Sequence, residues 1–181
     1  MLIEYKFIFV YNEGYGGILM EIHNIQPIYD ENSNILILGS FPSVKSREEN
    51  FFYAHPQNRF WRVISAIYSS KTPETIEDKK NFLINHKIAL WDVIESCEIN
   101  GSSDSSIKSV TPNRIDIILN TAKIQKIFTN GKASHRLFEK YIAPKCNVGD
   151  ICLPSTSPAN AAYSLEQLCL IWSDEIGKYI T

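Results

Sequence analysis

The chain has 181 residues, of which 44% are hydrophobic and 21% are charged, and its formal net charge is −2. This composition predicts one compact domain with a sizeable core and excludes disordered and fibrous classes. Apolar runs fall short of the roughly 20 residues that a membrane span requires, and no secretory signal pattern opens the chain. We therefore expect a cytoplasmic, monomeric protein that does not enter a membrane.

Residues 1–19 precede the part of the chain that carries recognisable patterns. Gly16 and Gly17 lie just upstream of Met20, where two glycine codons can form a purine-rich ribosome-binding site. We interpret residues 1–19 as a non-native or poorly ordered extension and expect one domain over residues 20–181. The alternative is that residues 5–10, which are rich in aromatic and β-branched side chains, form an edge strand.

Four short segments predict strands, at residues 35–38, 88–91, 124–128 and 151–153, and the first of them is an apolar run that ends abruptly at Gly39. Segments with helical periodicity separate them. This alternation predicts an α/β fold, a three-layer α/β/α sandwich around a central, mostly parallel four-stranded sheet.

Helix-start signals fall between and after these strands. Residues 58–68 place apolar side chains on one face, and Thr72, followed by Pro73, is the expected N-cap of the next helix. Residues 111–114 are expected to open another helix. Residues 164–167, Ser-Leu-Glu-Gln, have the pattern of a capping box before the last helix.

Two polar loops follow predicted strands. The first reads Gly-Ser-Phe-Pro-Ser at residues 39–43 and is followed by Phe-Phe-Tyr-Ala-His-Pro-Gln-Asn-Arg-Phe-Trp at residues 51–61. The second reads Pro-Ser-Thr-Ser-Pro-Ala-Asn at residues 154–160. Because open α/β sheets bind ligands beyond the carboxyl ends of their strands, we expect both loops to face one cleft.

These segments resemble the motifs of the uracil-DNA glycosylase superfamily, and most closely those of its hypoxanthine-DNA (deoxyinosine) glycosylase branch. The resemblance covers nearly all of residues 20–181. In the mismatch-specific relatives the first motif is Gly-Ile-Asn-Pro-Gly with a catalytic Asn, and alignment on Gly39 and Pro42 puts Phe41 at that position. The hypoxanthine branch shares this departure. The resemblance therefore implies that Asn58 is the catalytic residue.

The resemblance implies a DNA repair glycosylase that needs no cofactor or metal. Such an enzyme hydrolyses the N-glycosidic bond of a flipped deaminated base, here hypoxanthine, in double- or single-stranded DNA and leaves an abasic site. The preference among hypoxanthine, uracil and xanthine stays open. So does the exact role of Asn58, which can donate to the base or hold the attacking water.

The resemblance also assigns roles to the two loops. Tyr53 takes the position of the aromatic residue that stacks on the base, and Ser155 replaces a base-reading Asn. Ala159 replaces the bulky leucine that fills the gap left by the base. The expected base-pocket residues are Gly39, Ser40, Phe41, Tyr53, His55 and Ser155, and the expected DNA-binding residues are Pro42, Ser43, Ser157, Pro158, Ala159 and Asn160.

Structural roles compete with several of these assignments. Asn58 precedes a predicted helix and suits an N-cap, and the serines suit turns and caps. His55 can be satisfied by backbone groups. Asp92, at the end of a strand, either orients a water or a donor, or makes a structural hydrogen bond. The loop at residues 100–106 either approaches DNA or is a plain surface connection.

Other function classes compete with the glycosylase. A serine or cysteine hydrolase lacks support because the chain has no G-x-S-x-G elbow. A non-catalytic DNA-binding module is compatible with the loss of the motif Asn.

The basic residues near the loops form either a local DNA-binding face or ordinary solvated helix surfaces. The four cysteines have no CxxC spacing, which predicts free thiols and argues against an iron–sulfur cluster.

Overall fold

The computed structural model describes residues 20–180. The extension at residues 1–19, with the alternative strand at residues 5–10, lies outside the described residues. A parallel four-stranded sheet has the order β3-β2-β6-β7 and consists of β2 (Ile35–Gly39), β3 (Ile88–Asp92), β6 (Lys126–Asn130) and β7 (Asp150–Leu153). The sheet and its covering helices confirm the predicted α/β/α sandwich.

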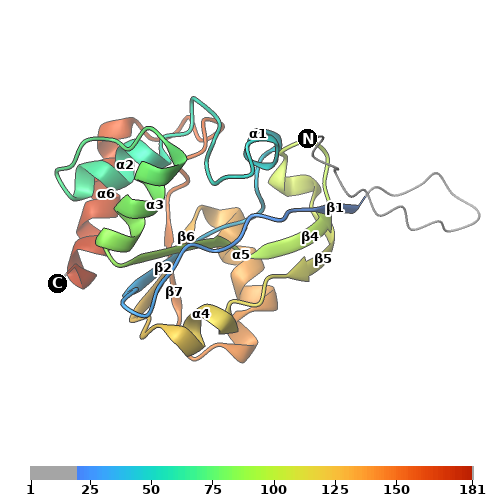
Figure 1. The fold of residues 1–181 in the computed structure, drawn as a ribbon. Coiled ribbons are helices and arrows are strands. Elements are labelled where there is room, and N and C mark those ends of the chain that lie inside the picture. Colours follow the sequence, from blue (N-terminus) through green and yellow to red (C-terminus); the bar gives the residue numbers. More distant parts are fainter. Residues whose placement is uncertain (1–19, 181) are drawn as a thin grey trace, which may run out of the picture.

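The helices cover both faces of this sheet because the chain crosses it in two directions. From β2 the chain moves one way to β3, and from β3 it moves the other way through β6 to β7. Right-handed crossovers then put the connecting helices on opposite faces. Figure 1 shows α2, α3 and α6 together on one side of the sheet and α5 on the other. The helices are α1 (Val44–Glu48), α2 (Phe60–Ile67), α3 (Ile76–Asn85), α4 (Asp116–Thr121), α5 (Lys132–Tyr141) and α6 (Leu165–Ile176).

Every residue of β2 and β3 is buried, which explains why these strands read as continuous apolar runs. The last helix, α6, buries Leu168, Trp172 and Ile176 at helical spacing. Its predicted capping box is confirmed, because Ser164 and Gln167 each accept the other's backbone amide. Within residues 20–180, none of the helices has the length and apolar character that crossing a membrane would demand.

A second, three-stranded antiparallel sheet in the order β1-β4-β5 was not predicted; it consists of β1 (Met20–Ile22), β4 (Ile94–Glu98) and β5 (Lys108–Pro112). The expected helix opening at residues 111–114 is wrong for this reason. Pro112 ends an edge strand, where its missing N–H costs no ladder hydrogen bond, and α4 begins only at Asp116.

The expected N-cap at Thr72 is also wrong. Thr75 caps α3, since Asp78 three residues later completes a reciprocal capping box, whereas Thr72 has no acid or amide at the equivalent position. The Thr72 hydroxyl instead lies 3.0 Å from that of Ser65.

Three short 3-10 helices complete the described fold, at Asp104–Ser106 (η1), Ala143–Lys145 (η2) and Gly177–Tyr179 (η3). The four cysteines are unpaired.

Candidate active site

A cavity opens at the carboxyl ends of three parallel strands, where Gly39 ends β2, Asp92 ends β3 and Asn130 ends β6. The chain leaves β2 toward one face of the sheet and β6 toward the other, which creates a crevice of the kind that binds ligands in open α/β sheets. Both motif-bearing loops border this cavity, as the sequence predicts.

Nine of the predicted site residues line the cavity: Gly39, Ser40, Phe41, Pro42, Ser43, Tyr53, Asn58, Ser155 and Ser157. Asp92, for which the sequence leaves a functional and a structural role open, also lines it. Six others line it without having been predicted as site residues: Ser46, Phe52, Ser102, Asp104, Asn130 and Thr156. His55, Pro158, Ala159 and Asn160 are not among its lining residues. Asn130 and Asp92 could have been found in the sequence, because each is the last residue of a strand of the parallel sheet, as Gly39 is.

The carboxamide of Asn58 has a fixed orientation. Its Oδ1 accepts the backbone N–H of Phe60 at 3.0 Å and the hydroxyl of Thr156 at 3.0 Å. Because the Phe60 amide can only donate, the atom that faces it is the oxygen, and the NH₂ group is the one left for the cavity. Arg59, rather than Asn58, is the N-cap residue of α2, but the Asn58 oxygen still satisfies the Phe60 amide at the start of the helix while its nitrogen stays available.

Thr156 connects Asn58 to the sheet. The residue is fully buried, its backbone N–H donates to Asn130 Oδ1 at 2.9 Å, and its Oγ1 accepts from Asn130 Nδ2 at 2.9 Å. Its own hydroxyl proton then goes to Asn58. These hydrogen bonds connect Asn130, at the end of β6, to Thr156 in the second loop and, through Thr156, to Asn58 just before α2. Buried networks in which every member is satisfied hold their side chains rigidly.

Arg59 holds the second loop against the start of α2. Its guanidinium donates to the carbonyl oxygens of Thr156 at 3.3 Å, Ser157 at 2.6 Å, Asn160 at 2.9 Å and Tyr163 at 2.5 Å. Five N–H donors in a rigid planar fork make arginine suited to such a role. The Arg59 guanidinium therefore binds backbone carbonyls of the second loop.

Tyr53 has a strained backbone, with φ of 51°, a conformation uncommon outside glycine. Its ring stacks on Phe60 with centroids 4.0 Å apart and planes inclined by 22°. The hydroxyl is buried without a hydrogen-bond partner in the described part of the chain. Burial, followed by the nearby Asp92 carboxyl, raises the pKa of this phenol, so the group stays neutral.

Asp92 is a buried carboxyl at the cavity, with only 4% of the residue exposed. Its Oδ2 has no hydrogen-bond partner within residues 20–180. Burial raises the pKa of Asp92 to about 7, with a smaller contribution from the Asp104 carboxylate. The backbone beside it is fixed, because Asn113 Nδ2 donates to the Asp92 carbonyl at 3.0 Å and Val93 N–H donates to the Gly39 carbonyl at 2.9 Å.

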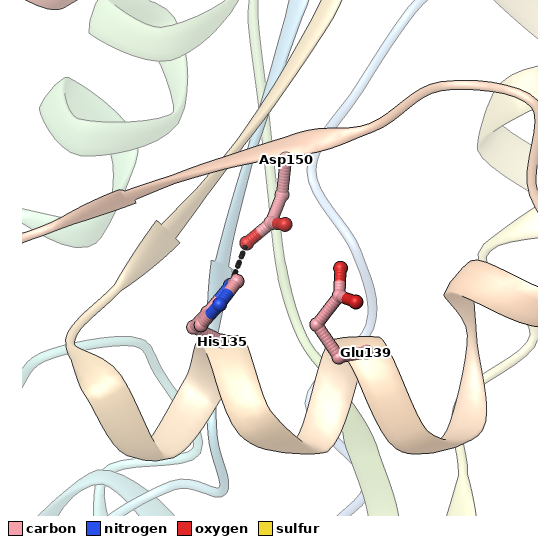
Figure 2. A group of neighbouring side chains, drawn as sticks. All are labelled: His135, Glu139 and Asp150. Atoms are coloured by element: carbon pink, nitrogen blue, oxygen red, sulfur yellow. Dashed lines mark hydrogen bonds and ion pairs between the residues drawn. The ribbon is translucent and has the colours of Figure 1, made fainter.

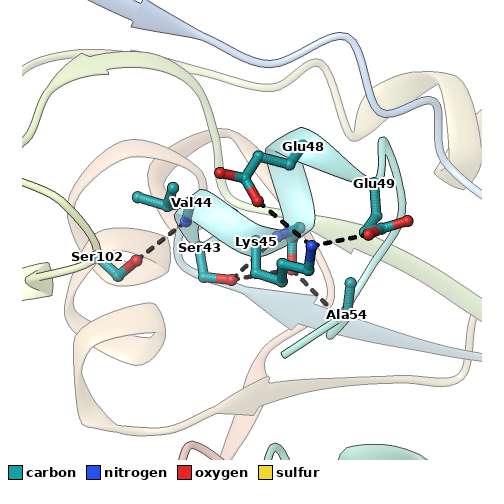
Figure 3. Close-up of polar contacts among 8 residues, drawn as sticks. Ser43, Val44, Lys45, Glu48, Glu49, Ala54 and Ser102 are labelled. Carbon is teal, nitrogen blue, oxygen red and sulfur yellow. Dashed lines mark hydrogen bonds and ion pairs between the residues drawn. The ribbon is translucent and has the colours of Figure 1, made fainter. Parts of the chain in front are cut away.

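The first loop is fixed by side-chain hydrogen bonds, which Figure 3 shows from the start of α1. Ser43 caps this helix, Ser102 Oγ accepts the Val44 amide at 3.0 Å, and the Ala54 amide donates to Ser46 Oγ at 3.2 Å. Ser102 belongs to the polar loop at residues 100–106. That loop therefore folds back over the first motif and is more than a surface connection.

Asp104, from η1 in the same polar loop, makes a second contact with the first motif. The Ser40 hydroxyl donates to its carboxylate at 2.6 Å. Burial raises the pKa of Asp104, while the Ser40 hydrogen bond and the Arg136 charge act in the opposite direction. An acidic group thus lies at the cavity rim.

Several basic residues near the loops are already paired. Lys45 lies 2.9 Å from Glu49 and 3.4 Å from Glu48, Arg47 donates to the Pro42 carbonyl at 2.7 Å, and Arg114 lies 2.9 Å from Asp116 (Figure 3 for Lys45). With Arg59, four of the basic residues that suggest a DNA-binding face are thus already held by other groups of the protein. The eight basic residues near the loops are Lys45, Arg47, Arg59, Arg62, Lys108, Arg114, Lys132 and Arg136.

The predicted site residues outside the cavity lining have structural contacts. His55 Nδ1 accepts the Gln57 amide at 3.2 Å, and the His55 carbonyl accepts the Asn58 amide at 2.8 Å, so His55 shapes the turn that presents Asn58. Asn160 Nδ2 donates to the Ser155 carbonyl at 2.8 Å. Pro158 and Ala159 are exposed at the tip of the second loop.

A His–carboxylate group lies outside the cavity, between α5 and β7. Figure 2 shows His135 and Glu139 on one face of α5 and Asp150 above them. His135 Nδ1 lies 2.8 Å from Asp150 Oδ2, which also accepts the Thr129 hydroxyl at 2.6 Å. Because the buried carboxylate already has these two partners, we interpret the group as an anchor of α5 to the sheet.

An α/β/α domain with a polar cavity at the strand ends, bordered by two motif-bearing loops, has the architecture in which open α/β sheets bind their ligands. The chain belongs to the Uracil DNA glycosylase superfamily, whose family model matches residues 26–174. It is therefore a DNA glycosylase of that superfamily.

Relatives of known name and structure agree with this membership. The chain is 33% identical over 117 residues to a protein named Hypoxanthine DNA glycosylase from Methanosarcina barkeri, covering 64% of this chain and 74% of the relative. It is 32% identical over 139 residues to a protein of the same name from Methanosarcina acetivorans, covering 76% and 87%. The solution NMR structure of a proposed uracil DNA glycosylase from Methanosarcina acetivorans superposes with a TM-score of 0.73 at 29% identity, covering 86% of this chain and 95% of that one.

Proposed function

We propose that the protein is a monofunctional hypoxanthine-DNA glycosylase, which hydrolyses the N-glycosidic bond of a flipped deoxyinosine and leaves an abasic site. The observation that carries this proposal is the fixed Asn58 carboxamide, whose NH₂ group is left for the cavity. The names of the two relatives from Methanosarcina support hypoxanthine as the base.

The chemistry follows from the charges of the reaction. Hydrolysis leaves positive character on the sugar and negative charge on the departing base. A hydrogen-bond donor aimed at the base therefore stabilises the transition state and can raise the rate by about 10²–10³-fold. Asn58 is the proposed donor. Its oxygen is held by two hydrogen bonds, so the group needs no reorganisation when charge develops.

Binding of the extruded base is assigned to the cavity walls. The ring of Tyr53 is proposed to lie against the face of the base, since Phe60 supports it from behind; such a contact is worth about 1–3 kcal/mol. Gly39, Ser40, Phe41 and Ser155 complete the proposed pocket.

The two loops supply the proposed DNA contacts. Ser43 and Ser157 are half-buried residues that line the cavity, and Pro42 is buried beside Ser43. Pro158 and Ala159 are exposed at the tip of the second loop, next to Asn160. Serine hydroxyls and backbone amides of this kind position phosphates without reading sequence. The small side chain of Ala159 favours bases that leave the duplex easily, such as deaminated or mispaired ones.

The test uses purified protein and oligonucleotides that carry one hypoxanthine, uracil or xanthine, each followed by alkali treatment to break abasic sites. We expect breakage first at hypoxanthine. Faster breakage at uracil makes this protein a uracil glycosylase, in line with the name of the solved relative. Binding of the hypoxanthine duplex without breakage identifies a non-catalytic module.

A further inference from the structure

Two polar side-chain atoms within residues 20–180 are buried without any hydrogen-bond partner, and both lie at the cavity. They are Asp92 Oδ2 and the Tyr53 hydroxyl. Buried polar groups in folded proteins are nearly always paired, because an unpaired one costs stability. Two unpaired groups that border the same cavity therefore point to a ligand that completes them.

Gly39 makes room for the carboxyl itself. A Cβ at this position would lie 2.1 Å from Asp92 Oδ1 and 3.2 Å from the Tyr53 hydroxyl. Gly39 is not among the residues of positive φ, so the close approach, rather than the backbone conformation, requires glycine here. The first motif thus begins with a residue whose missing side chain allows the Asp92 carboxyl to lie against the end of β2.

We propose that Asp92 reads the N–H/C=O lactam edge of the extruded base, the edge that deamination creates. This inference rests on the proposed glycosylase function and names the feature of the base that the site selects. The Tyr53 ring is assigned to the base face, which leaves the base edge to the carboxyl. Asp92 is then a specificity residue, distinct in role from the Asn58 donor.

The chemistry of the two edges explains the selection. Hypoxanthine and xanthine present N1–H beside a carbonyl at C6, and uracil presents N3–H beside a carbonyl at C4. Their parents adenine and cytosine present an unprotonated ring nitrogen beside an amino group. A neutral carboxyl offers one acceptor and one donor side by side, so it pairs with the lactam through two hydrogen bonds.

The surroundings of Asp92 favour the neutral carboxyl that this pairing needs. Burial raises the pKa of Asp92 to about 7, and the Asp104 carboxylate acts in the same direction. The titratable groups facing it are Tyr53 and Asp104. The pKa of Tyr53 is raised, so that the phenol stays neutral, and burial raises the pKa of Asp104 while the Ser40 hydrogen bond and the Arg136 charge lower it. Ionisation of Asp92 removes the donor and places a negative charge against the base carbonyl.

The test compares single-turnover excision of hypoxanthine with excision of unsubstituted purine, which lacks the carbonyl and the N1 proton. Wild-type protein, Asp92→Leu and Asp92→Asn are each measured with both bases. We expect Asp92→Leu to lower hypoxanthine excision by at least ~10² and purine excision by less than about threefold, because a site built to hydrogen-bond a group strongly rejects the analogue lacking it. Equal losses for both bases would overturn the inference.

Asp92→Asn gives a second measurement if the leucine variant does not fold. Its amide keeps one donor and one acceptor and has no proton to lose, so hypoxanthine excision by this variant should exceed that of Asp92→Leu. Its rate should also stay level as pH rises through about 7, where the wild-type rate falls. Parallel pH profiles would contradict the proposal. If wild-type protein excises no deaminated base, the proposed function fails as well; if it excises hypoxanthine with unchanged selectivity in the variants, only the Asp92 inference fails.

Discussion

The Thr156 hydroxyl donates to the Asn58 carboxamide oxygen over 3.0 Å, and the carboxamide of Asn130 in turn holds both the amide and the hydroxyl of Thr156. A residue of the second motif therefore sets the direction in which a residue of the first motif presents its NH₂ group. Because Asn130 ends a central strand, the sheet itself fixes this orientation. Substitutions in this network and in the contacts beside it should separate the role of each side chain.

Replacing Asn58 separates its capping oxygen from its donor nitrogen. Asn58→Asp keeps an oxygen for the Phe60 amide and the Thr156 hydroxyl but loses the NH₂ group, so single-turnover hypoxanthine excision should fall by at least ~10². Asn58→Ala should lose the same activity and also about 0.5–2 kcal/mol of unfolding free energy. Excision rates and urea unfolding check both effects. Near-normal excision by folded Asn58→Asp protein would show that the amide donor is not the catalytic group.

Thr156 is expected to act on activity through Asn58. Thr156→Val keeps the shape of the side chain but leaves Asn58 Oδ1 and Asn130 Nδ2 each short of one partner, which should cost about 1–3 kcal/mol of unfolding free energy. With Asn58 less firmly held, excision should fall about tenfold in folded protein, as buried polar networks position their members cooperatively. Thr156→Ser keeps the hydroxyl and should restore both quantities. A valine variant with the wild-type rate would remove Thr156 from the positioning of Asn58.

The sequence was sufficient for the layers of the fold and for the two loops of the site. Buried strands such as Ile35–Gly39 are recognisable as apolar runs, and the Gly-Ser-Phe-Pro-Ser turn marks the end of one of them. The small antiparallel sheet escaped prediction because the residues of β5 are exposed or half-buried and the strand ends in Pro112, a pattern that equally suits a helix start.

Side-chain orientation in the site could not be predicted for a different reason. Asn58 as a cap and Asn58 as a donor need opposite ends of one carboxamide, and only the positions of Phe60 and Thr156 show that the oxygen faces the start of α2. The burial of Asp92 likewise depends on what surrounds the end of β3, including a loop that comes from residues 100–106.

Arg59 should matter through the loop it holds. Arg59→Met keeps the apolar stem but removes the guanidinium from four loop carbonyls, of which those of Asn160 and Tyr163 have no backbone donor in its place within residues 20–180. We expect a loss of at least about 2 kcal/mol of unfolding free energy, since hydrogen bonds to charged groups are worth about 1.5–3 kcal/mol. Arg62→Met is the matched control, because it removes the same charge from an exposed residue of the same helix. Urea unfolding of the two variants decides the point. Equal stability losses would mean that the contacts of Arg59 with the second loop contribute nothing beyond its charge.

Asp92 should make stability depend on pH in a direction opposite to that of most carboxyl groups. Its pKa is about 7 in the folded protein and 3.8 as the unperturbed reference, so between these values the folded state binds the proton more tightly than the unfolded state. Stability from this group is therefore present at low pH and declines as pH rises from about 4 to about 7.

Asp92→Asn has no such proton. The free energy of unfolding of Asp92→Asn relative to wild type should thus increase over this range, by a few kcal/mol at most, because each tenfold difference in proton affinity between the two states is worth about 1.4 kcal/mol. Urea unfolding of both proteins at about pH 4.5 and about pH 8 measures the difference. A difference that stays constant with pH would show that Asp92 titrates alike in the folded and unfolded chains and has no raised pKa.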